Sequence, residues 1–162
     1  MKRRILNERL AAIVASLRHG ELLYIGDSGG GVRKGSLYEL DQDVEYLDLG
    51  IVSGSPSFED VVRTLKEAGD FEAAIVAEDM EEANEKDFNM LVELFGRDHV
   101  HEINFAPETY EVRNRCVAVV QTGDIGRHAN AVLVAGYVDD PPIALDIVMG
   151  KKKYTTTPKS DR

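Results

Sequence analysis

The sequence predicts a single α/β domain in which helices flank a largely parallel sheet. Short apolar runs that are typical of buried strands alternate with segments whose apolar residues follow helical spacing. The chain has 162 residues, of which 43% are hydrophobic, so it is long enough to bury one sizeable core. We expect this domain to span residues 1–138 and the remainder, 139–162, to be a C-terminal extension.

The first predicted elements are a helix and a strand. Asn7 can cap a helix whose apolar residues recur at helical spacing, and Gly20 ends it. Residues 22–25 are a short apolar run of strand type. The three glycines at 29–31 form a loop in which a ligand could approach the backbone closely. Residues 37–49 mix strand-like alternation with acidic residues and predict a hairpin or an extended loop.

The rest of the predicted domain alternates helices and strands. Pro56 and Ser57 open a helix that Gly69 ends. The elements that follow are predicted at 71–77 (strand), 84–95 (helix), 100–105 (strand), 107–114 (short helix), 116–121 (strand) and 130–135 (strand).

The character of the chain changes beyond residue 139. Two prolines are followed by the apolar patch 143–149, three lysines and a polar run. We predict disorder from about residue 150. The apolar patch has no obvious place in the predicted core and could cover a neighbouring subunit.

Charge and cysteine content narrow the partners and the compartment. The chain has 19 basic and 29 acidic residues and a formal net charge of −10, which argues against nucleic acid as a partner, because binding it requires a basic face. The single cysteine, Cys116, excludes an intrachain disulfide and a thiolate metal cage and fits a reduced setting. Polar residues interrupt any signal-peptide core, and no apolar stretch approaches the roughly 20 residues of a membrane span. We therefore expect a cytoplasmic protein with no membrane partner.

His19 and Asp27 form the first candidate site. His19 lies at the end of the first predicted helix and Asp27 follows the first strand, so both could face one pocket if that strand runs back beside the helix. Histidine can give and take a proton near neutral pH, and a neighbouring carboxylate is a suitable partner. The alternative interpretation is that His19 interacts with the helix dipole and that Asp27 is a turn residue.

Other polar residues are weaker candidates. The glycines at 29–31 match neither a dinucleotide fingerprint nor a P-loop, so a glycine-rich turn is the better interpretation. Asp79 follows a predicted strand and could reach a pocket at its end, whereas the acidic residues around it are expected to face solvent or cap the next helix. His99 and His101 have no third ligand nearby, so we expect no metal site.

The turn before the last predicted strand contains His128 and Asn130. An asparagine amide can both donate to and accept from a sugar hydroxyl, which suits carbohydrate recognition. In isolation this segment is an ordinary turn, and its interest comes from the pattern around it.

Short segments along the chain carry a family resemblance. In chain order they are Leu6-Asn7, Leu17-Arg18-His19-Gly20, Ile25-Gly26-Asp27-Ser28-Gly29, Ser55-Pro56-Ser57-Phe58 with Val61-Val62, Ala73-Ala74-Ile75, Val119-Val120-Gln121-Thr122-Gly123-Asp124 and Ala129-Asn130-Ala131-Val132-Leu133. Their order and spacing resemble the D-ribose pyranase and L-fucose mutarotase family over residues 6–136.

The resemblance implies a reaction, a site and an assembly. His19 corresponds to the family's catalytic proton donor, and Asp27 to an acid that contacts the substrate. The segment His128-Ala129-Asn130 corresponds to a sugar-binding tripeptide that usually begins with tyrosine, so His128 is a departure. The implied reaction interconverts anomers or ring forms of a monosaccharide by acid/base catalysis without a cofactor. The implied assembly is a ring-shaped homo-oligomer, commonly a decamer, with sites between subunits.

Further departures concern which sugar is bound. Ribose-type members carry a histidine near Pro107 and a lysine one turn later, where this chain has Glu111. Tyr110 and Glu111, with Arg113 close by, are more similar to the fucose-type pattern and are additional candidates for sugar contacts. The loss of positive donors should disfavour ribose, so we expect a fucose-like or other hexose-derived sugar.

Two other functions fit the same residues. One is a monosaccharide-binding protein associated with sugar transport, in which loss of His19 would leave anomer exchange unaffected. The other is an isomerase or lyase that acts on a different polar metabolite, which His128 and the departures near Pro107 favour.

Overall fold

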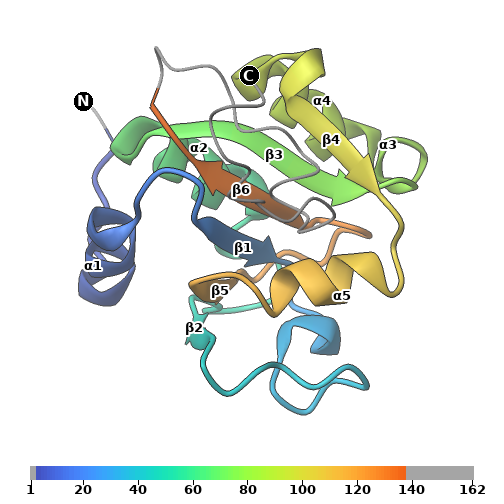
Figure 1. Ribbon diagram of the computed structural model, residues 1–162, viewed down its shortest axis with the longest axis horizontal. Coiled ribbons are helices and arrows are strands. Elements are labelled where there is room, and N and C mark those ends of the chain that lie inside the picture. Colours follow the sequence, from blue (N-terminus) through green and yellow to red (C-terminus); the bar gives the residue numbers. More distant parts are fainter. Residues whose placement is uncertain (1–2, 138–162) are drawn as a thin grey trace, which may run out of the picture.

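The computed structural model describes residues 3–137, which form one six-stranded sheet flanked by helices (Figure 1). The strand order is β2-β5-β1-β6-β3-β4. The strands are β1 (Leu22–Gly26), β2 (Glu45–Asp48), β3 (Phe71–Ala77), β4 (Val100–Ile103), β5 (Ala118–Gln121) and β6 (Ala131–Ala135). β6 runs antiparallel to its neighbours β1 and β3, and the other pairs are parallel. The predicted fold class, with a largely parallel sheet, is therefore confirmed.

The longer helices cover one face of the sheet and share its main hydrophobic core. They are α1 (Glu8–Ser16), α2 (Phe58–Ala68) and α4 (Glu85–Phe95). Each begins beside the predicted starting residue, because the side chains of Asn7, Ser57 and Asn84 each accept a hydrogen bond from the backbone N–H three residues further on.

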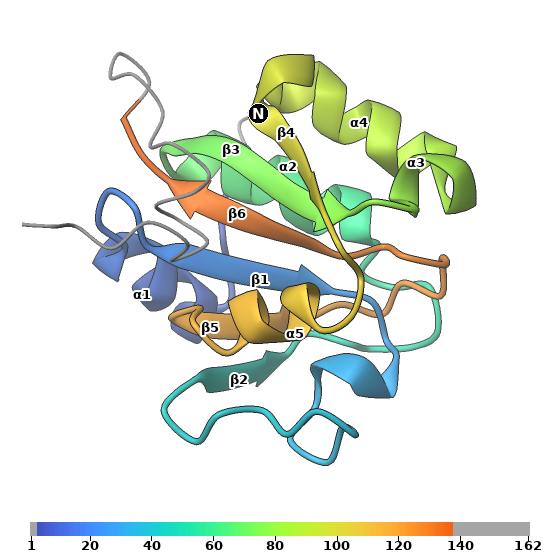
Figure 2. The ribbon, with the colours of Figure 1, turned by 45° about the vertical axis from the view of Figure 1, so that its right-hand side comes forward.

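Shorter elements cover the other face of the sheet. They are α5 (Glu108–Arg113) and the loop 32–44, and Figure 2 shows α5 on the opposite side of the sheet from α1 and α2. Val32 and Val44 from the loop and Val112 from α5 belong to a second hydrophobic cluster with residues of β1 and β6. Together the two clusters bury both faces of the sheet, as expected for a mostly parallel arrangement.

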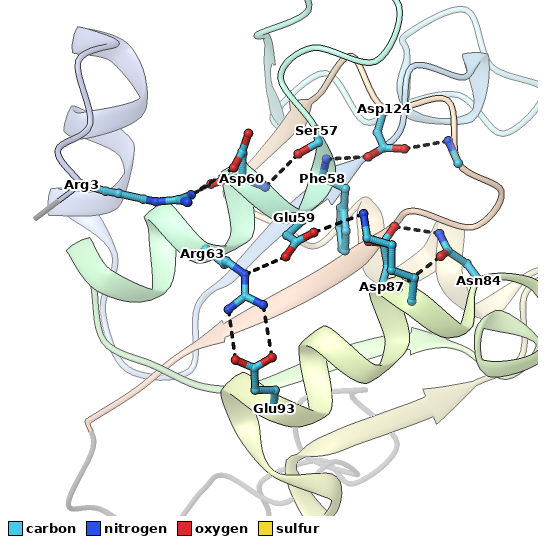
Figure 3. Close-up of polar contacts among 12 residues, drawn as sticks. Arg3, Ser57, Phe58, Glu59, Asp60, Arg63, Asn84, Asp87, Glu93 and Asp124 are labelled. Atoms are coloured by element: carbon cyan, nitrogen blue, oxygen red, sulfur yellow. Dashed lines mark hydrogen bonds and ion pairs between the residues drawn. The ribbon is translucent and has the colours of Figure 1, made fainter.

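Polar side chains join α2 to α4 on the first face (Figure 3). Arg63 pairs with Glu59 at 3.0 Å on its own helix and with Glu93 of α4 at 3.2 Å. Close by, Nδ2 of Asn84 donates to Oδ2 of the buried Asp87 at 2.8 Å. Burial raises the pKa of Asp87, since desolvation disfavours the charged carboxylate.

The structure corrects several predicted boundaries. Residues 37–49 form no hairpin, and the alternative prediction of a loop holds as far as residue 44, after which β2 pairs in parallel with β5. The strand predicted at 100–105 ends at Ile103, and a short helix that was not predicted, α3 (Met80–Ala83), precedes α4. β6 is antiparallel because the link 122–130 contains no helix, and a parallel return needs a crossover of about a dozen residues or more.

The strand directions decide which residues share an edge of the sheet. Since β1, β3, β4 and β5 run the same way, their carboxyl ends lie at the edge where β6 begins. Asp27, Asp79 and Asn130 are at this edge, whereas His19 precedes β1 at the opposite one. Ligands of such sheets bind at the carboxyl ends of the strands.

The predicted extension at 139–162 lies outside the described residues, and so do its apolar patch at 143–149 and the disorder predicted from about residue 150. No helix within residues 3–137 is long and apolar enough to cross a membrane.

Candidate functional site

A cavity of about 440 Å³ lies at the carboxyl edge of the sheet. Its walls come from the loop after β1, the segment that leads into α5, and the turn before β6. The lining side chains include Tyr24, Asp27, Phe105, Tyr110, His128 and Asn130. The structure therefore brings together Asp27, His128 and Asn130, all predicted as substrate contacts, and adds the candidate Tyr110 to the same cavity.

Asp27 and Asn130 form the fixed centre of this cavity. Nδ2 of Asn130 donates to Oδ2 of Asp27 at 2.8 Å, and Oδ1 of Asn130 accepts from the backbone N–H of Asp27 at 3.2 Å. Oδ1 of Asp27 accepts from the N–H of Gly29 at 2.7 Å. The carboxylate is thus held by neutral donors, and its remaining lone pairs can accept from a ligand hydroxyl.

Tyr24 and Gln121 support this pair from the sheet. The Tyr24 hydroxyl donates to Oδ1 of Asn130 at 3.3 Å. Burial, reinforced by the charge of Asp27, raises the pKa of the Tyr24 phenol, so it stays neutral. Nε2 of Gln121 donates to the carbonyl groups of Asp27 at 3.1 Å and Gly29 at 2.9 Å. These contacts hold the backbone after β1 in place, which favours a preformed site.

Asp124 anchors the turn that leads into β6. Its Oδ2 accepts from the N–H of Phe58, at the start of α2, at 2.7 Å, and its Oδ1 accepts from the N–H of Gly126 at 2.7 Å (Figure 3). The first N–H groups of a helix lack partners within it, so a carboxylate there is stabilised. The Asp124 carbonyl accepts from the N–H of Ser28 at 2.8 Å, which ties this turn to the loop after β1.

His128 has an unusual backbone and a charged neighbour. Its φ is +53°, in the left-handed region that few residues other than glycine adopt. Nε2 of His128 lies 3.1 Å from Oδ2 of Asp79, and the ring packs edge-on against Phe105 with 5.2 Å between centroids. Asp79, which we predicted to reach a pocket at its strand end, therefore contacts a side chain that lines the cavity.

Aromatic rings form one wall of the cavity. Tyr110 stacks on Tyr38 with 4.3 Å between ring centroids, and Phe105 packs edge-on against Tyr110 at 5.8 Å. Arg113 is fully buried behind this wall, and its guanidinium donates to three carbonyl groups of the loop 31–39 at 2.5, 2.5 and 2.9 Å. The loop is thereby held against α5.

His19 lies at the opposite end of β1 from Asp27, so the two do not form a pair within one chain. The predicted shared pocket is wrong for a single chain, because the whole length of β1 separates the residue before it from the residue after it. Nε2 of His19 lies 3.0 Å from Oε2 of Glu72, and its ring packs edge-on against Tyr137 at 5.5 Å. His19 lines a second cavity, of about 450 Å³, beside α1.

Glu72 was not among the predicted site residues, and the candidate Glu111 does not line the cavity. Glu72 is a buried carboxylate in the otherwise apolar strand β3, and that exception was the available signal, because acidic residues are rarely buried without a partner. Glu111 is exposed and Pro107 also lies outside the lining of the cavity. The support that Arg113 gives to the loop had no signal in the sequence.

The side chains around the cavity are suited to hydrogen bonding and proton transfer. They include carboxylates, an amide, two phenols and an imidazole, which can exchange hydrogen bonds with the hydroxyl groups of a polar ligand. An imidazole can also move a proton near neutral pH. Within residues 3–137, no three His, Cys, Asp or Glu side chains gather in a group that could hold a metal ion.

Known proteins resemble this chain over nearly all of the described residues. The model of the RbsD / FucU transport protein family matches residues 1–138. A D-ribose pyranase of Symbiobacterium thermophilum is 37% identical over 135 residues, which cover 83% of this chain and 96% of that protein. A D-ribose pyranase of Coprothermobacter proteolyticus is 32% identical over 139 residues, which cover 85% and 99%.

Solved structures agree with these matches. Bacillus subtilis RbsD complexed with D-ribose superimposes with a TM-score of 0.73 at 28% identity, over 85% of this chain and 98% of that one. A fucose mutarotase from Streptococcus pneumoniae, in complex with L-fucose, superimposes with a TM-score of 0.62 over 85% of this chain and 99% of that one. The latter is 13% identical, so it supports the fold alone.

Proposed function

Because this chain belongs to the RbsD / FucU family, we propose that it interconverts the anomers or ring forms of a monosaccharide, as a mutarotase or pyranase. Its relatives are ring-form isomerases, and the chain is an isomerase of the same kind. The observation that carries the proposal is the cavity in which Asp27, Asn130 and His128 meet.

The reaction needs only positioned hydroxyl groups and proton transfer. A proton leaves the anomeric hydroxyl, another reaches the ring oxygen, and the ring closes again on the other face of the carbonyl carbon. Asp27 can accept a hydrogen bond from a sugar hydroxyl, and Asn130 is held in a fixed orientation by Tyr24 and Asp27. Such acid/base assistance typically contributes about 10²–10⁴-fold.

We infer that His19 of a neighbouring copy supplies the proton donor. The support is that His19 lies at the far edge of its own sheet, in a cavity of its own, while the family resemblance gives it the donor role. Glu72 holds its ring through Nε2, which suits an imidazole that must be correctly oriented. A ring-shaped decamer and a cytoplasmic location remain predictions.

The sugar is proposed to be fucose-like or otherwise derived from a hexose, in preference to ribose. The support is the aromatic wall of Tyr110 and Phe105, whose rings suit the less polar face of a deoxysugar. Glu111 lies outside the cavity lining, so this preference no longer depends on its carboxylate.

Saturation-transfer NMR tests the reaction and the sugar together. The exchange of magnetisation between anomers of ribose, fucose and common hexoses is measured with the wild-type protein and with His19→Ala. We expect faster exchange for at least one sugar and loss of most of the acceleration in a folded His19→Ala protein. If neither protein accelerates exchange, the chain is a binding protein. If His19→Ala accelerates exchange as much as wild type does, the mechanism is different.

The same measurement ranks the sugars. Ribose as the preferred substrate would refute the proposed specificity and leave the reaction standing. The variant His128→Tyr should change the ranking of the sugars, because the residue lines the cavity beside Asn130. Identical rate ratios before and after the substitution would contradict this part of the proposal.

A further inference from the structure

We propose that His128 and Asp79 form a catalytic pair within the cavity of one chain, in which His128 is the base for the sugar's anomeric hydroxyl and Asp79 is its positioning residue. This inference rests on the proposed function and assigns the second proton transfer, which His19 as the donor does not supply. It makes Asp79, whose side chain is 43% exposed, a participant in the reaction.

The imidazole of His128 is fixed in one orientation. Its side chain is 14% exposed, Nε2 lies 3.1 Å from Oδ2 of Asp79, and the ring packs edge-on against Phe105. Within residues 3–137 no hydrogen bond reaches Nδ1. Because Asp79 occupies Nε2, Nδ1 is the ring nitrogen that remains for a ligand in the cavity. The left-handed backbone at His128 adds to this argument, since strained residues concentrate at functional sites.

The side chain of Asp79 does not cap the helix that it precedes. It stands at the N-terminal position of α3, but its side chain accepts no hydrogen bond from that helix. Its Oδ1 is buried and has no hydrogen-bond partner in the described part of the chain. Leaving a carboxylate oxygen in that state is costly, so the arrangement is better explained by the contact with His128 than by stability.

The carboxylate determines which proton the imidazole carries. The negative charge of Asp79 beside Nε2 favours the tautomer with hydrogen on that nitrogen, which leaves a lone pair on Nδ1, and it stabilises the imidazolium that forms when Nδ1 takes a proton. A carboxylate that orients a catalytic histidine in this way is a recurring arrangement in acyl-transfer enzymes.

The proton transfers balance over one cycle. Nδ1 of His128 takes the proton of the anomeric hydroxyl as the bond between the anomeric carbon and the ring oxygen breaks, and the anomeric oxygen becomes a carbonyl. The electron pair of the broken bond goes to the ring oxygen, which takes a proton from the donor. On closure this hydroxyl returns its proton to the donor and attacks the other carbonyl face, while the carbonyl oxygen takes the proton from His128.

Kinetics of Asp79→Asn test the pair. This substitution keeps the shape of the side chain and removes its charge. We expect the maximal exchange rate to fall about 10-fold to 100-fold while the KM changes less than about 3-fold, because general-base assistance is lost and the sugar contacts are kept. The control is Glu82→Gln, the same change of charge at an exposed position of α3, which should behave as wild type.

A second variant separates catalysis from folding. His128→Phe keeps an aromatic ring beside Phe105 and removes both ring nitrogens. In that background Asp79→Asn should cause no further loss of rate, because the carboxylate acts only through the imidazole. An equal loss in both backgrounds would show a structural role for Asp79 and overturn the proposal.

Nitrogen-15 NMR of the histidine side chains provides a readout that does not depend on activity. The chain has four histidines, so the His128→Phe spectrum identifies the signal of His128 by difference. We expect the neutral ring to carry hydrogen on Nε2 in the wild type and to become a mixture of tautomers in Asp79→Asn. A tautomer that is unaffected by the substitution, or a wild-type rate in Asp79→Asn, overturns the pair and leaves mutarotation standing. Absence of exchange with every sugar overturns both.

Discussion

A site shared between copies predicts that two inactive variants restore each other when they assemble together. The five residues of β1 separate His19 from Asp27, and at about 3.3 Å per residue this strand spans roughly 16 Å. Both side chains would have to reach one sugar within hydrogen-bonding distance, roughly 3 Å. A single monosaccharide cannot contact both residues of one chain. Each site therefore takes His19 from one copy and Asp27 from another, and His19→Ala and Asp27→Asn each remove one of these two contributions.

The size of the rescue follows from this geometry. In oligomers of equal amounts of the two variants, a site is intact only when the copy that contributes His19 carries the Asp27→Asn change and the copy that contributes Asp27 carries the His19→Ala change. Random mixing makes about a quarter of the sites intact, so about a quarter of the wild-type exchange rate should return.

The assay is saturation-transfer NMR on protein from cells that express both variants with different tags, purified through both tags in turn. The matched control pairs Asp27→Asn with Asn130→Ala, because these two residues contact each other in the same chain and every mixed site then retains a defect. Failure of the first mixture to exceed either parent, or equal recovery in both mixtures, would refute a shared site.

Three further predictions concern residues that the mechanism and the fold depend on. Glu72→Gln should lower the maximal exchange rate about 10-fold or more, because Glu72 orients the imidazole of His19. In the His19→Ala background the same substitution should cause no further loss of rate, and additive losses would contradict this role. Because the pKa of Asp87 is raised, ionisation of this buried carboxyl lowers the free energy of unfolding at neutral pH. This destabilisation disappears as pH falls through the raised pKa and the carboxyl becomes protonated. Asp87→Asn should therefore unfold at a higher temperature than wild type at pH 7, with the difference closing towards about pH 4, and a lower unfolding temperature at pH 7 would count against it. Arg113→Met should reduce the free energy of unfolding in urea by about 3 kcal/mol, because three carbonyl groups of the loop lose the donor that the buried Arg113 supplies. The exposed Arg115→Met should change it little, and equal effects would disprove the role of Arg113.

The local elements of this protein could be predicted because their signals are local. Asn7 and Ser57 cap helices by bonding to backbone three residues away, and residues 71–77 form the strand that their apolar run predicts. The carboxylate and amide of Asp27 and Asn130 could be chosen as sugar contacts for the chemistry of their groups and for the family resemblance. Residues 37–49 gave a weaker signal, since the partner of β2 is β5, far along the chain.

The sequence by itself determined the α/β class, most helices and strands, the family and the residue types that are proposed to contact a sugar. Only the tertiary structure decided which of them meet. It separated His19 from Asp27, joined His19 to Glu72, and brought Asp79 to His128. The reason is physical: these contacts depend on the order and direction of strands, which the packing of the whole chain sets, and residues 53 apart, as His19 and Glu72 are, share no local pattern.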